Sequence, residues 1–545
     1  MDHSWSQRLG VWWIAEDHPD LPAVVASPSG TTSTFGELAG RAHQIVHALR
    51  SRGIGDGDIV AYALPNDVDI LWWPLAFQEM GVRSIALNPA LTGAEVAHIV
   101  QASGARALVV DAGFPEIASL AASPLASGTT LDLAVSVAGD IEGFTRDEDL
   151  VDGHPTTLPP DRSFGMPISY SSGTTGAPKG IVRPPIPGDP SDIADAMKLF
   201  GQAFQMEPLE GVHLASAGMH HGGCQSFYQG ALNVGQALAI MGKFDAVGAL
   251  EMIDRYQVTS AYMVPTQFVR LLRLPDEVRA RYSLSSLRTV VHSAAPCPVE
   301  VKQQMMDWWG PVIWETYGGM EGAAAIAKPQ RWLEKPGTVG RAVRGMRIKI
   351  LDDDGAELPT GETGLVYLEP TQPTFEYLGD PELTASVHSG RAFTLGDVGY
   401  LDDDGFLFLR DRAKDMIISG GVNIYPAEVE GALTTHPSVR DVAVIGLPDP
   451  EWGETVTAVV ELEDGVDGSD ALADELIEHC RERLARFKCP RTVTFRSSLP
   501  RTEAGKLYKR LLVDEYRAVD ELRAVDDLRT TDEPRATDEQ RADRS

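Results

Sequence analysis

The chain has 545 residues, which is too long for one ordinary hydrophobic core, so we expect two or more domains. Hydrophobic residues make up 43% of it and aromatic residues 7%, which is typical of a globular protein and argues against a disordered one. The formal net charge of −31 opposes nonspecific binding to nucleic acid or to an anionic membrane, so an anionic ligand such as a nucleotide requires a local group of cations.

No segment predicts membrane insertion or export. The sequence has no run of about 18 or more uncharged apolar residues, and its N-terminal segment lacks a basic region followed by a long apolar stretch. The cysteines have neither metal-ligand spacing nor a disulfide pattern: Cys224, Cys297, Cys480 and Cys489. We therefore expect a cytoplasmic protein with no stable membrane association.

From about residue 1 to 330, short apolar runs alternate with amphipathic stretches. Thr34–Arg50 carries apolar residues at helical spacing. The candidate strands are Ile59–Leu64, Ala107–Asp111, Ser260–Pro265 and Thr289–His292. This alternation predicts layered α/β sheets in a large N-terminal domain.

From about 338 to 410 the pattern changes to short β-like runs. Acidic glycine turns, DDDG at 352–355 and at 402–405, predict hairpins in a β-rich subdomain. A smaller α+β unit follows. We therefore divide the chain into a large domain at 1–410, a small, mobile C-terminal domain at 411–512 and a tail at 513–545.

The tail repeats arginine every six positions, and this period matches neither 3.5 nor 3.6 residues per turn. The repeated residues are Arg517, Arg523, Arg529, Arg535 and Arg541. Few large apolar residues offset the entropy of ordering, so we predict a flexible or partly helical solvated tail. An arm that binds a partner is the alternative.

The segment SSGTTGAPKG at 171–180 combines glycines, hydroxyls and one cation. Its glycines allow a close approach to a ligand, and Met166–Tyr170 before it is predicted as a strand, so the loop leaves a strand end as phosphate sites often do. A flexible surface loop is the alternative. The residues expected to bind phosphate are Ser171, Ser172, Gly173, Thr174, Thr175, Gly176 and Lys179.

The loop lacks the glycine–lysine–serine/threonine spacing of a Walker A motif. It closely resembles instead the phosphate loop of the adenylate-forming superfamily, which includes acyl-CoA synthetases, peptide-synthetase adenylation domains and luciferases. Further motifs follow in that family's order over roughly residues 30–512. The next segment, RPPIPGDP at 183–190, departs from the family because its prolines prevent a helix from beginning at once.

Two motifs resemble the family's adenine and Mg²⁺ segments: HSAAP at 292–296 and YGGMEG at 317–322. The resemblance implies that Tyr317 stacks on adenine and that Glu321 holds Mg²⁺. The other residues that it places at the nucleotide are Ala294, Ala295, Pro296, Gly318 and Met320.

Three later motifs resemble the family's ribose, inter-domain and catalytic-lysine segments. In LGDVGYLDDDGF at 395–406 the resemblance implies that Asp397 binds both ribose hydroxyls. In DRAKDMIISGGVNIYPAEVE at 411–430 it implies a ribose contact from Arg412, a hinge at Lys414 and a pantetheine channel. The channel would be lined by Ser419, Gly420 and Gly421, and PRTEAGKLYKR at 500–510 supplies the catalytic Lys506.

The resemblance implies an acyl-CoA synthetase that uses ATP, Mg²⁺ and coenzyme A to activate a carboxylic acid as an acyl-AMP. Negative charge builds around the α-phosphate, so Lys506 would bridge it and the carboxylate. His220 in GMHHGG at 218–223 resembles the histidine that gates the acyl pocket. His221 and a packed structural histidine are the alternatives.

Met320 stands where the family has a threonine, whose hydroxyl would bond the α-phosphate. A hydrogen bond to a charged group is worth about 1.5–3 kcal/mol. One interpretation is a tolerated substitution in an ordinary two-step enzyme. The other is weak adenylation, so that the protein mainly converts a preformed acyl-AMP into a thioester; Leu395 in place of another threonine supports it.

Two further classes stay open. An adenylation enzyme that loads a carrier protein would use the same glycine channel, and a non-catalytic nucleotide-binding protein is disfavoured by the retained motif residues. The sequence does not identify the acyl substrate, although glycines at 222, 223, 318 and 319 suggest room for a bulky or long acid. The oligomeric state is open, a homo-oligomer included.

Overall fold

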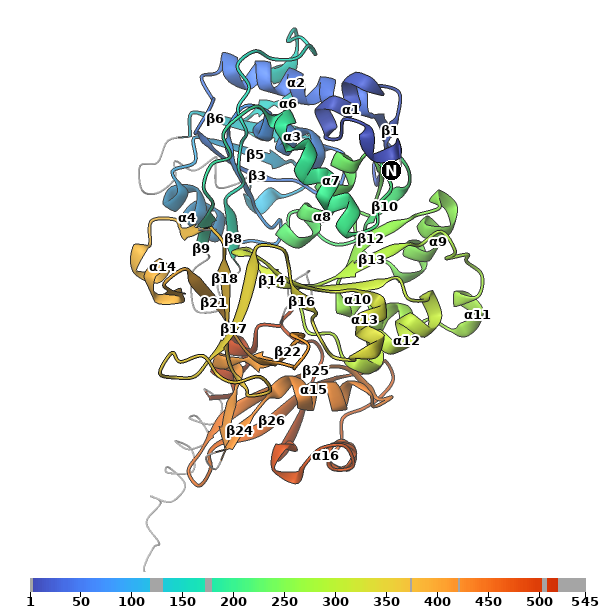
Figure 1. Ribbon diagram of the computed structural model, residues 1–545, viewed down its shortest axis with the longest axis vertical. Coiled ribbons are helices and arrows are strands. Elements are labelled where there is room, and N and C mark those ends of the chain that lie inside the picture. Colours follow the sequence, from blue (N-terminus) through green and yellow to red (C-terminus); the bar gives the residue numbers. More distant parts are fainter. Residues whose placement is uncertain are drawn as a thin grey trace, which may run out of the picture. The chain divides into compact units, whose positions relative to one another are not determined.

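The computed structural model describes residues 3–117, 131–171, 179–372, 375–419, 422–501 and 507–517 (Figure 1). These residues form two compact units. One ends at Leu409, and the other begins at Arg410, runs to Arg501 and resumes at Leu507. Within these ranges no helix is long and apolar enough to cross a membrane.

The first unit contains a nine-stranded sheet in the order β16-β15-β14-β13-β12-β10-β11-β1-β2. The six strands from β14 to β1 pair in parallel, and β2, β15 and β16 are antiparallel at the edges. The strands are β1 (Pro22–Ala26), β2 (Ser33–Thr34), β10 (Val212–Ala215), β11 (Ala237–Ile240), β12 (Ser260–Met263), β13 (Thr289–His292), β14 (Ile313–Gly319), β15 (Gly322–Ala327) and β16 (Arg341–Ala342).

Helices cover both faces of this sheet, as the alternation of side chains along its strands requires. On β13, Val290 packs into a cluster with α9, α10 and α12, whereas Val291 packs into a cluster with α8. The helices of this region are η2 (Pro190–Ile193), α7 (Ala194–Ala203), α8 (Gly222–Val234), α9 (Ala246–Tyr256), α10 (Pro265–Leu272), α11 (Asp276–Arg279), α12 (Val299–Trp309) and α13 (Pro329–Glu334).

A second sheet of the first unit is entirely parallel, in the order β4-β3-β5-β6-β7. Thr34 begins the long helix α2 through a capping box, in which its hydroxyl accepts from the Glu37 amide at 3.2 Å and its amide donates to the Glu37 carboxylate at 2.9 Å. The elements are η1 (His3–Ser6), α1 (Val11–Asp17), α2 (Phe35–Ser51), β3 (Ile59–Ala63), α3 (Asp69–Glu79), β4 (Arg83–Ala86), α4 (Gly93–Ser103), β5 (Ala107–Asp111), β6 (Leu133–Val137), β7 (Thr145–Arg146) and α6 (Asp147–Val151).

A β-rich part completes the first unit. One sheet has the order β17-β18-β21-β20, with β22 beside β21, and a small sheet has the order β19-β9-β8. In the turn at 402–405, the Asp402 carboxylate accepts from the Phe406 amide at 2.8 Å. The elements are β8 (Ser169–Ser171), β9 (Lys179–Val182), β17 (Met346–Leu351), β18 (Gly364–Pro370), β19 (Glu376–Tyr377), α14 (Pro381–Val387), β20 (His388–Ser389), β21 (Ala392–Leu401) and β22 (Leu407–Arg412).

The second unit is a smaller α+β structure. Its sheet has the order β24-β23-β26-β25, with β27 parallel to β26. The elements are η3 (Ala413–Asp415), β23 (Ile417–Ser419), β24 (Val422–Ile424), α15 (Pro426–Thr434), β25 (Val439–Asp449), β26 (Gly453–Leu462), α16 (Asp470–Arg481), η4 (Arg486–Lys488) and β27 (Thr492–Arg496). The predicted class, a large α/β part with a β-rich subdomain and a smaller α+β part, is therefore confirmed.

Candidate nucleotide site

The carboxyl ends of β13 and β14, which pair in parallel, lie side by side and form an edge where α/β proteins commonly bind ligands. The Ser293 hydroxyl donates to the Thr316 carbonyl at 2.8 Å and ties the two ends together. Ala294 follows with a φ of 74°, a left-handed conformation that costs a non-glycine residue roughly 1–3 kcal/mol. Ala294 and Pro296 are exposed and Ala295 is half-buried, so their backbone is accessible to a ligand.

Tyr317 and Asp397 form a buried hydrogen-bonded pair. The Tyr317 hydroxyl donates to Asp397 Oδ2 at 2.7 Å, which joins β14 to β21 across 80 residues of sequence. Both residues are less than a tenth exposed. The structure therefore brings together the side chains predicted to contact adenine and ribose.

Glu321 lies in the turn between β14 and β15. The Tyr377 hydroxyl donates to its Oε1 at 2.9 Å, so the small β19-β9-β8 sheet is linked to this turn. Burial and then the charge of Glu321 raise the pKa of Tyr377. On the adjacent strand β9, the Lys179 ammonium lies 6.0 Å from the centre of the Tyr377 ring. Lys179 and Glu321 thus approach one aromatic side chain that the sequence did not single out.

Arg183 is a second residue that the motifs missed. Its Nη2 donates to the Met320 carbonyl at 2.6 Å. Packing of protein around the guanidinium lowers its pKa, and the negative charge of Glu321 opposes that shift. The only signal in the sequence is a cation four residues after Lys179, which is too common a pattern to predict a contact with residue 320.

The Met320 side chain packs against the first turn of α8. A Cβ atom on Gly222 would overlap the Met320 sulfur and terminal methyl, and one on Gly319 would meet Leu395 and Glu321. A Cβ atom on Gly223 would meet the Tyr262 hydroxyl. Neighbouring side chains therefore contact the positions that a Cβ atom would take on these three glycines, and room for a bulky acid stays a prediction. A Cβ atom on Gly318 would meet the backbone of β15.

His220 and His221 precede α8 with their ring centres 4.1 Å apart. Burial lowers the pKa of His221 to about 4, and burial together with its neighbour lowers the pKa of His220 well below the usual range. Both are therefore neutral at pH 7, and within the described structure neither buried Nε2 has a hydrogen-bond partner. The geometry favours neither histidine over the other as the pocket residue.

The second unit carries the remaining predicted residues that the structure describes. Arg412 ends β22, which crosses from the first unit into the second at Arg410. Lys414 lies in η3, and Ser419 ends β23. The Asp411 carboxylate accepts from the amides of Arg412 at 2.7 Å and of Ala427 at 2.8 Å, which ties this segment to the start of α15.

Several predicted residues lie outside the described residues: Ser172, Gly173, Thr174, Thr175, Gly176, Gly420, Gly421 and Lys506. Ser171 is the last residue of β8, so the described part of the loop leaves a strand. The predicted strand at 166–170 is thus shifted to Ser169–Ser171.

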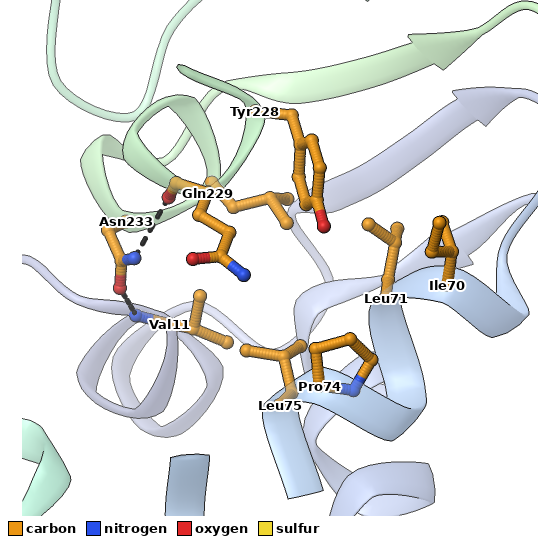
Figure 2. A pocket seen from close by; sticks show the side chains of 9 residues that line it. Val11, Ile70, Leu71, Pro74, Leu75, Tyr228, Gln229 and Asn233 are labelled. Atoms are coloured by element: carbon orange, nitrogen blue, oxygen red, sulfur yellow. Dashed lines mark hydrogen bonds between the residues drawn. The ribbon is translucent and has the colours of Figure 1, made fainter. Parts of the chain in front are cut away.

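Figure 2 shows a pocket elsewhere in the first unit, between α1, α3 and α8. Its lining is mostly apolar, and the Tyr228 hydroxyl points into it (Figure 2). None of the predicted site residues lines this pocket. It is therefore separate from the candidate nucleotide site.

Comparison with known proteins gives the same assignment to nearly the whole chain. The family model of AMP-binding enzymes matches residues 11–378, and that of the AMP-binding enzyme C-terminal domain matches residues 428–506. A feruloyl-CoA synthase from Amycolatopsis sp is 33% identical over 508 residues, which cover 92% of this chain and 98% of that protein.

Two further relatives are similar over the same extent. The long-chain-fatty-acid–CoA ligase FadD13 from Mycobacterium tuberculosis is 30% identical over 514 residues, covering 92% of this chain and 96% of that protein. The crystal structure of the anthranilate CoA ligase AuaEII in complex with anthranoyl-AMP superposes with a TM-score of 0.82 and covers 96% of this chain and 99% of that chain. The two sequences are 26% identical.

Proposed function

This chain belongs to the AMP-binding enzyme family, and from that premise we propose that Tyr317, Asp397 and Glu321 hold ATP. We further propose that the acid it activates is an aromatic carboxylic acid. The chain is an AMP-forming acid–CoA ligase, which forms an acyl-adenylate and transfers the acyl group to coenzyme A. The observation that carries the residue roles is the hydrogen bond of 2.7 Å between Tyr317 and Asp397. It joins two motifs that the resemblance assigns to one nucleotide.

The reaction has two steps. A carboxylate oxygen attacks the α-phosphorus of ATP, the bond to the bridging oxygen of the β-phosphate breaks, and pyrophosphate leaves. The CoA thiolate then attacks the acyl carbon, and AMP leaves. Because negative charge builds at the phosphate in the first step, fixed cations are the main requirement. We propose Lys506 as the catalytic cation and Lys414 as the hinge that lets one small unit serve both steps.

Glu321 fits Mg²⁺. The ion accepts one or two protein carboxylates and takes its other ligands from water and substrate phosphates. Glu321 presents one carboxylate, held in place by the Tyr377 hydroxyl. Bound there, Mg²⁺ would neutralise phosphate charge.

The acid is proposed to be aromatic for two reasons. The relatives include a feruloyl-CoA synthase and an anthranilate CoA ligase, and both of those acids carry a ring. In this chain the Met320 thioether lies on Gly222, directly after the neutral His220–His221 pair, and a thioether makes favourable contacts with an aromatic ring.

The test is a panel of ferulate, anthranilate and straight-chain acids, each assayed for pyrophosphate release and for the CoA thioester. We expect both products with the aromatic acids. Faster turnover of the straight-chain acids would reject the aromatic class. Thioester formed only from synthetic acyl-AMP would instead support weak adenylation, and unchanged turnover of a Lys506→Ala variant would reject the catalytic lysine.

Replacement of CoA by a carrier protein in the same assay tests the other acceptor. Location in the cytoplasm and the oligomeric state stay predictions.

A further inference from the structure

Arg183 lies beside the candidate nucleotide site and carries a positive charge that an anionic ligand could bind. It directly follows β9, and because side chains alternate along a strand, Arg183 continues the face of Lys179 and Ile181. Ile181 is buried in the cluster that contains Tyr317, with Tyr377 packed beside it. This face of β9 is therefore turned toward the residues assigned to ATP.

The guanidinium has unused hydrogen-bonding capacity. Its Nη2 donates to the Met320 carbonyl, and no second hydrogen bond or ion pair of this side chain is found among the described residues. A guanidinium has five N–H donors and stays charged at neutral pH. Arg183 also keeps a solvent-exposed face, so a ligand can reach the remaining donors.

We propose that Arg183 binds the phosphate oxygens of ATP near the α-phosphorus and supplies the charge-assisted hydrogen bond that Met320 cannot donate. The proposal rests on the adenylation step proposed above. In that step the carboxylate oxygen–phosphorus bond forms and the phosphorus–oxygen bond to pyrophosphate breaks, so charge builds on the oxygens that Arg183 would contact. The planar fork of an arginine suits two phosphate oxygens, which a lysine cannot bridge in the same way.

The hydrogen bond to the Met320 carbonyl orients the guanidinium of Arg183. The carbonyl of residue 320 holds one Nη of Arg183 at 2.6 Å, next to the carboxylate proposed to hold Mg²⁺. The backbone of Met320 thus positions a cation where its side chain lacks a hydroxyl. A purely structural role, in which Arg183 only fastens the β14–β15 turn, is the competing explanation.

The two explanations differ in which half-reaction they affect. The assay compares Arg183→Gln and Arg183→Lys in two measurements: pyrophosphate release with ATP and acid, and thioester formation from synthetic acyl-AMP and CoA. We expect Arg183→Gln to slow pyrophosphate release roughly ten- to 150-fold, as the loss of a hydrogen bond to a charged group predicts. Thioester formation from acyl-AMP should fall clearly less, because acyl-AMP keeps the α-phosphate but this step builds no charge on a departing pyrophosphate. Pyrophosphate release by Arg183→Lys should lie between that of Arg183→Gln and that of the unaltered protein.

A matched control and a rescue complete the experiment. Arg347 is an exposed arginine on β17, in a different sheet from β9, and it pairs with Glu357. Arg347→Gln should therefore change neither half-reaction. Met320→Thr in the Arg183→Gln background should restore part of the pyrophosphate release, because the hydroxyl returns a donor.

Equal losses in both half-reactions, or unchanged pyrophosphate release, would overturn the proposal for Arg183. If the unaltered protein releases no pyrophosphate with any acid, the proposed function itself fails, and the role of Arg183 falls with it.

Discussion

At the scale of single residues, the site depends on hydroxyl–carboxylate pairs that the motifs alone do not reveal. The resemblance names Tyr317 for adenine and Asp397 for ribose, but the structure adds that the two bind each other. Tyr377 holds Glu321 in the same way, and no motif includes Tyr377. Tyrosine hydroxyls therefore orient the two carboxylates that we propose to bind the nucleotide and Mg²⁺.

A Tyr317→Phe variant tests this orientation. The ring stays available for stacking, but Asp397 loses a hydrogen bond of 2.7 Å in a buried place. We expect the KM for ATP to rise roughly tenfold or more, since a hydrogen bond to a charged group is worth about 1.5–3 kcal/mol. Steady-state pyrophosphate release measures it. Tyr282→Phe, which removes an exposed hydroxyl bonded to Glu251, should leave the KM unchanged; equal effects of both variants would contradict the expectation.

At the scale of elements, the sequence predicted strands and helices well where the local signal was strong. Ala107–Asp111 and Thr289–His292 are strands with the predicted bounds. The strand predicted at Ser260–Pro265 ends at Met263 because Pro265 starts α10, and Thr34 caps α2 instead of belonging to it. Proline at the first helical position and a threonine cap are local signals that correct such bounds.

Contacts between distant strands account for what the sequence could not predict at the site. Tyr377 reaches Glu321 only because β19 pairs with β9. Arg183 reaches Met320 across 137 residues of sequence. Nothing in the local pattern around either residue encodes these pairings, so the motifs could propose nucleotide ligands but not the residues that contact them.

The start of α8 offers a steric test at this scale. A Gly222→Ala substitution places a methyl group against the sulfur and terminal methyl of Met320. Because this flexible end can move aside, the cost should lie at the low end of the about 1–3 kcal/mol typical of overpacking. We expect a lower free energy of unfolding in a denaturant titration and slower adenylation. The Gly222→Ala/Met320→Ala double variant should recover the stability, and failure to do so would show that Met320 is not the obstacle.

A buried ion pair lies between α12 and β14, at the residue of β14 that pairs with His292 of β13. The Lys302 ammonium lies 2.7 Å from Glu315, and Lys302 is fully buried. Burial alone would raise the pKa of Glu315, but the charges of Lys302 and His292 lower it to about 2. Glu315→Gln leaves the Lys302 charge unpaired, so we expect a loss of about 3–5 kcal/mol in the free energy of unfolding.

Chemical denaturation measures this loss. In the Lys302→Met/Glu315→Gln double variant no unpaired charge remains, so much of the stability should return. A single Glu315→Gln variant as stable as the unaltered protein would contradict a structural role for the pair.

At the scale of the whole molecule, the large unit is predicted to lose stability in acid because it buries a neutral histidine. His213 on β10 is fully buried in the nine-stranded sheet, and its Nδ1 lies 2.9 Å from the Ser260 hydroxyl. Burial lowers the pKa of His213 from the usual 6.5 to about 3. Below pH 6.5 His213 binds a proton in the unfolded chain but stays neutral in the folded one, which favours unfolding. The free energy of unfolding that neutral His213 contributes is therefore fully present above pH 6.5 and is lost as the pH falls toward 3.

A His213→Gln variant isolates that contribution, since glutamine is neutral at every pH and retains an amide for Ser260. Denaturant unfolding from about pH 7 to about pH 4.5 should show the unaltered protein losing about 1.4 kcal/mol more per pH unit than the variant once the pH is below 6.5. The free energy of unfolding of the unaltered protein, relative to that of the variant, should therefore decrease steadily as the pH falls. The exposed His18, replaced by glutamine, gives the control and should run parallel to the unaltered protein. If the curve of His213→Gln also runs parallel to that of the unaltered protein, His213 binds its proton as readily in the folded state as in the unfolded one, which would contradict the expectation.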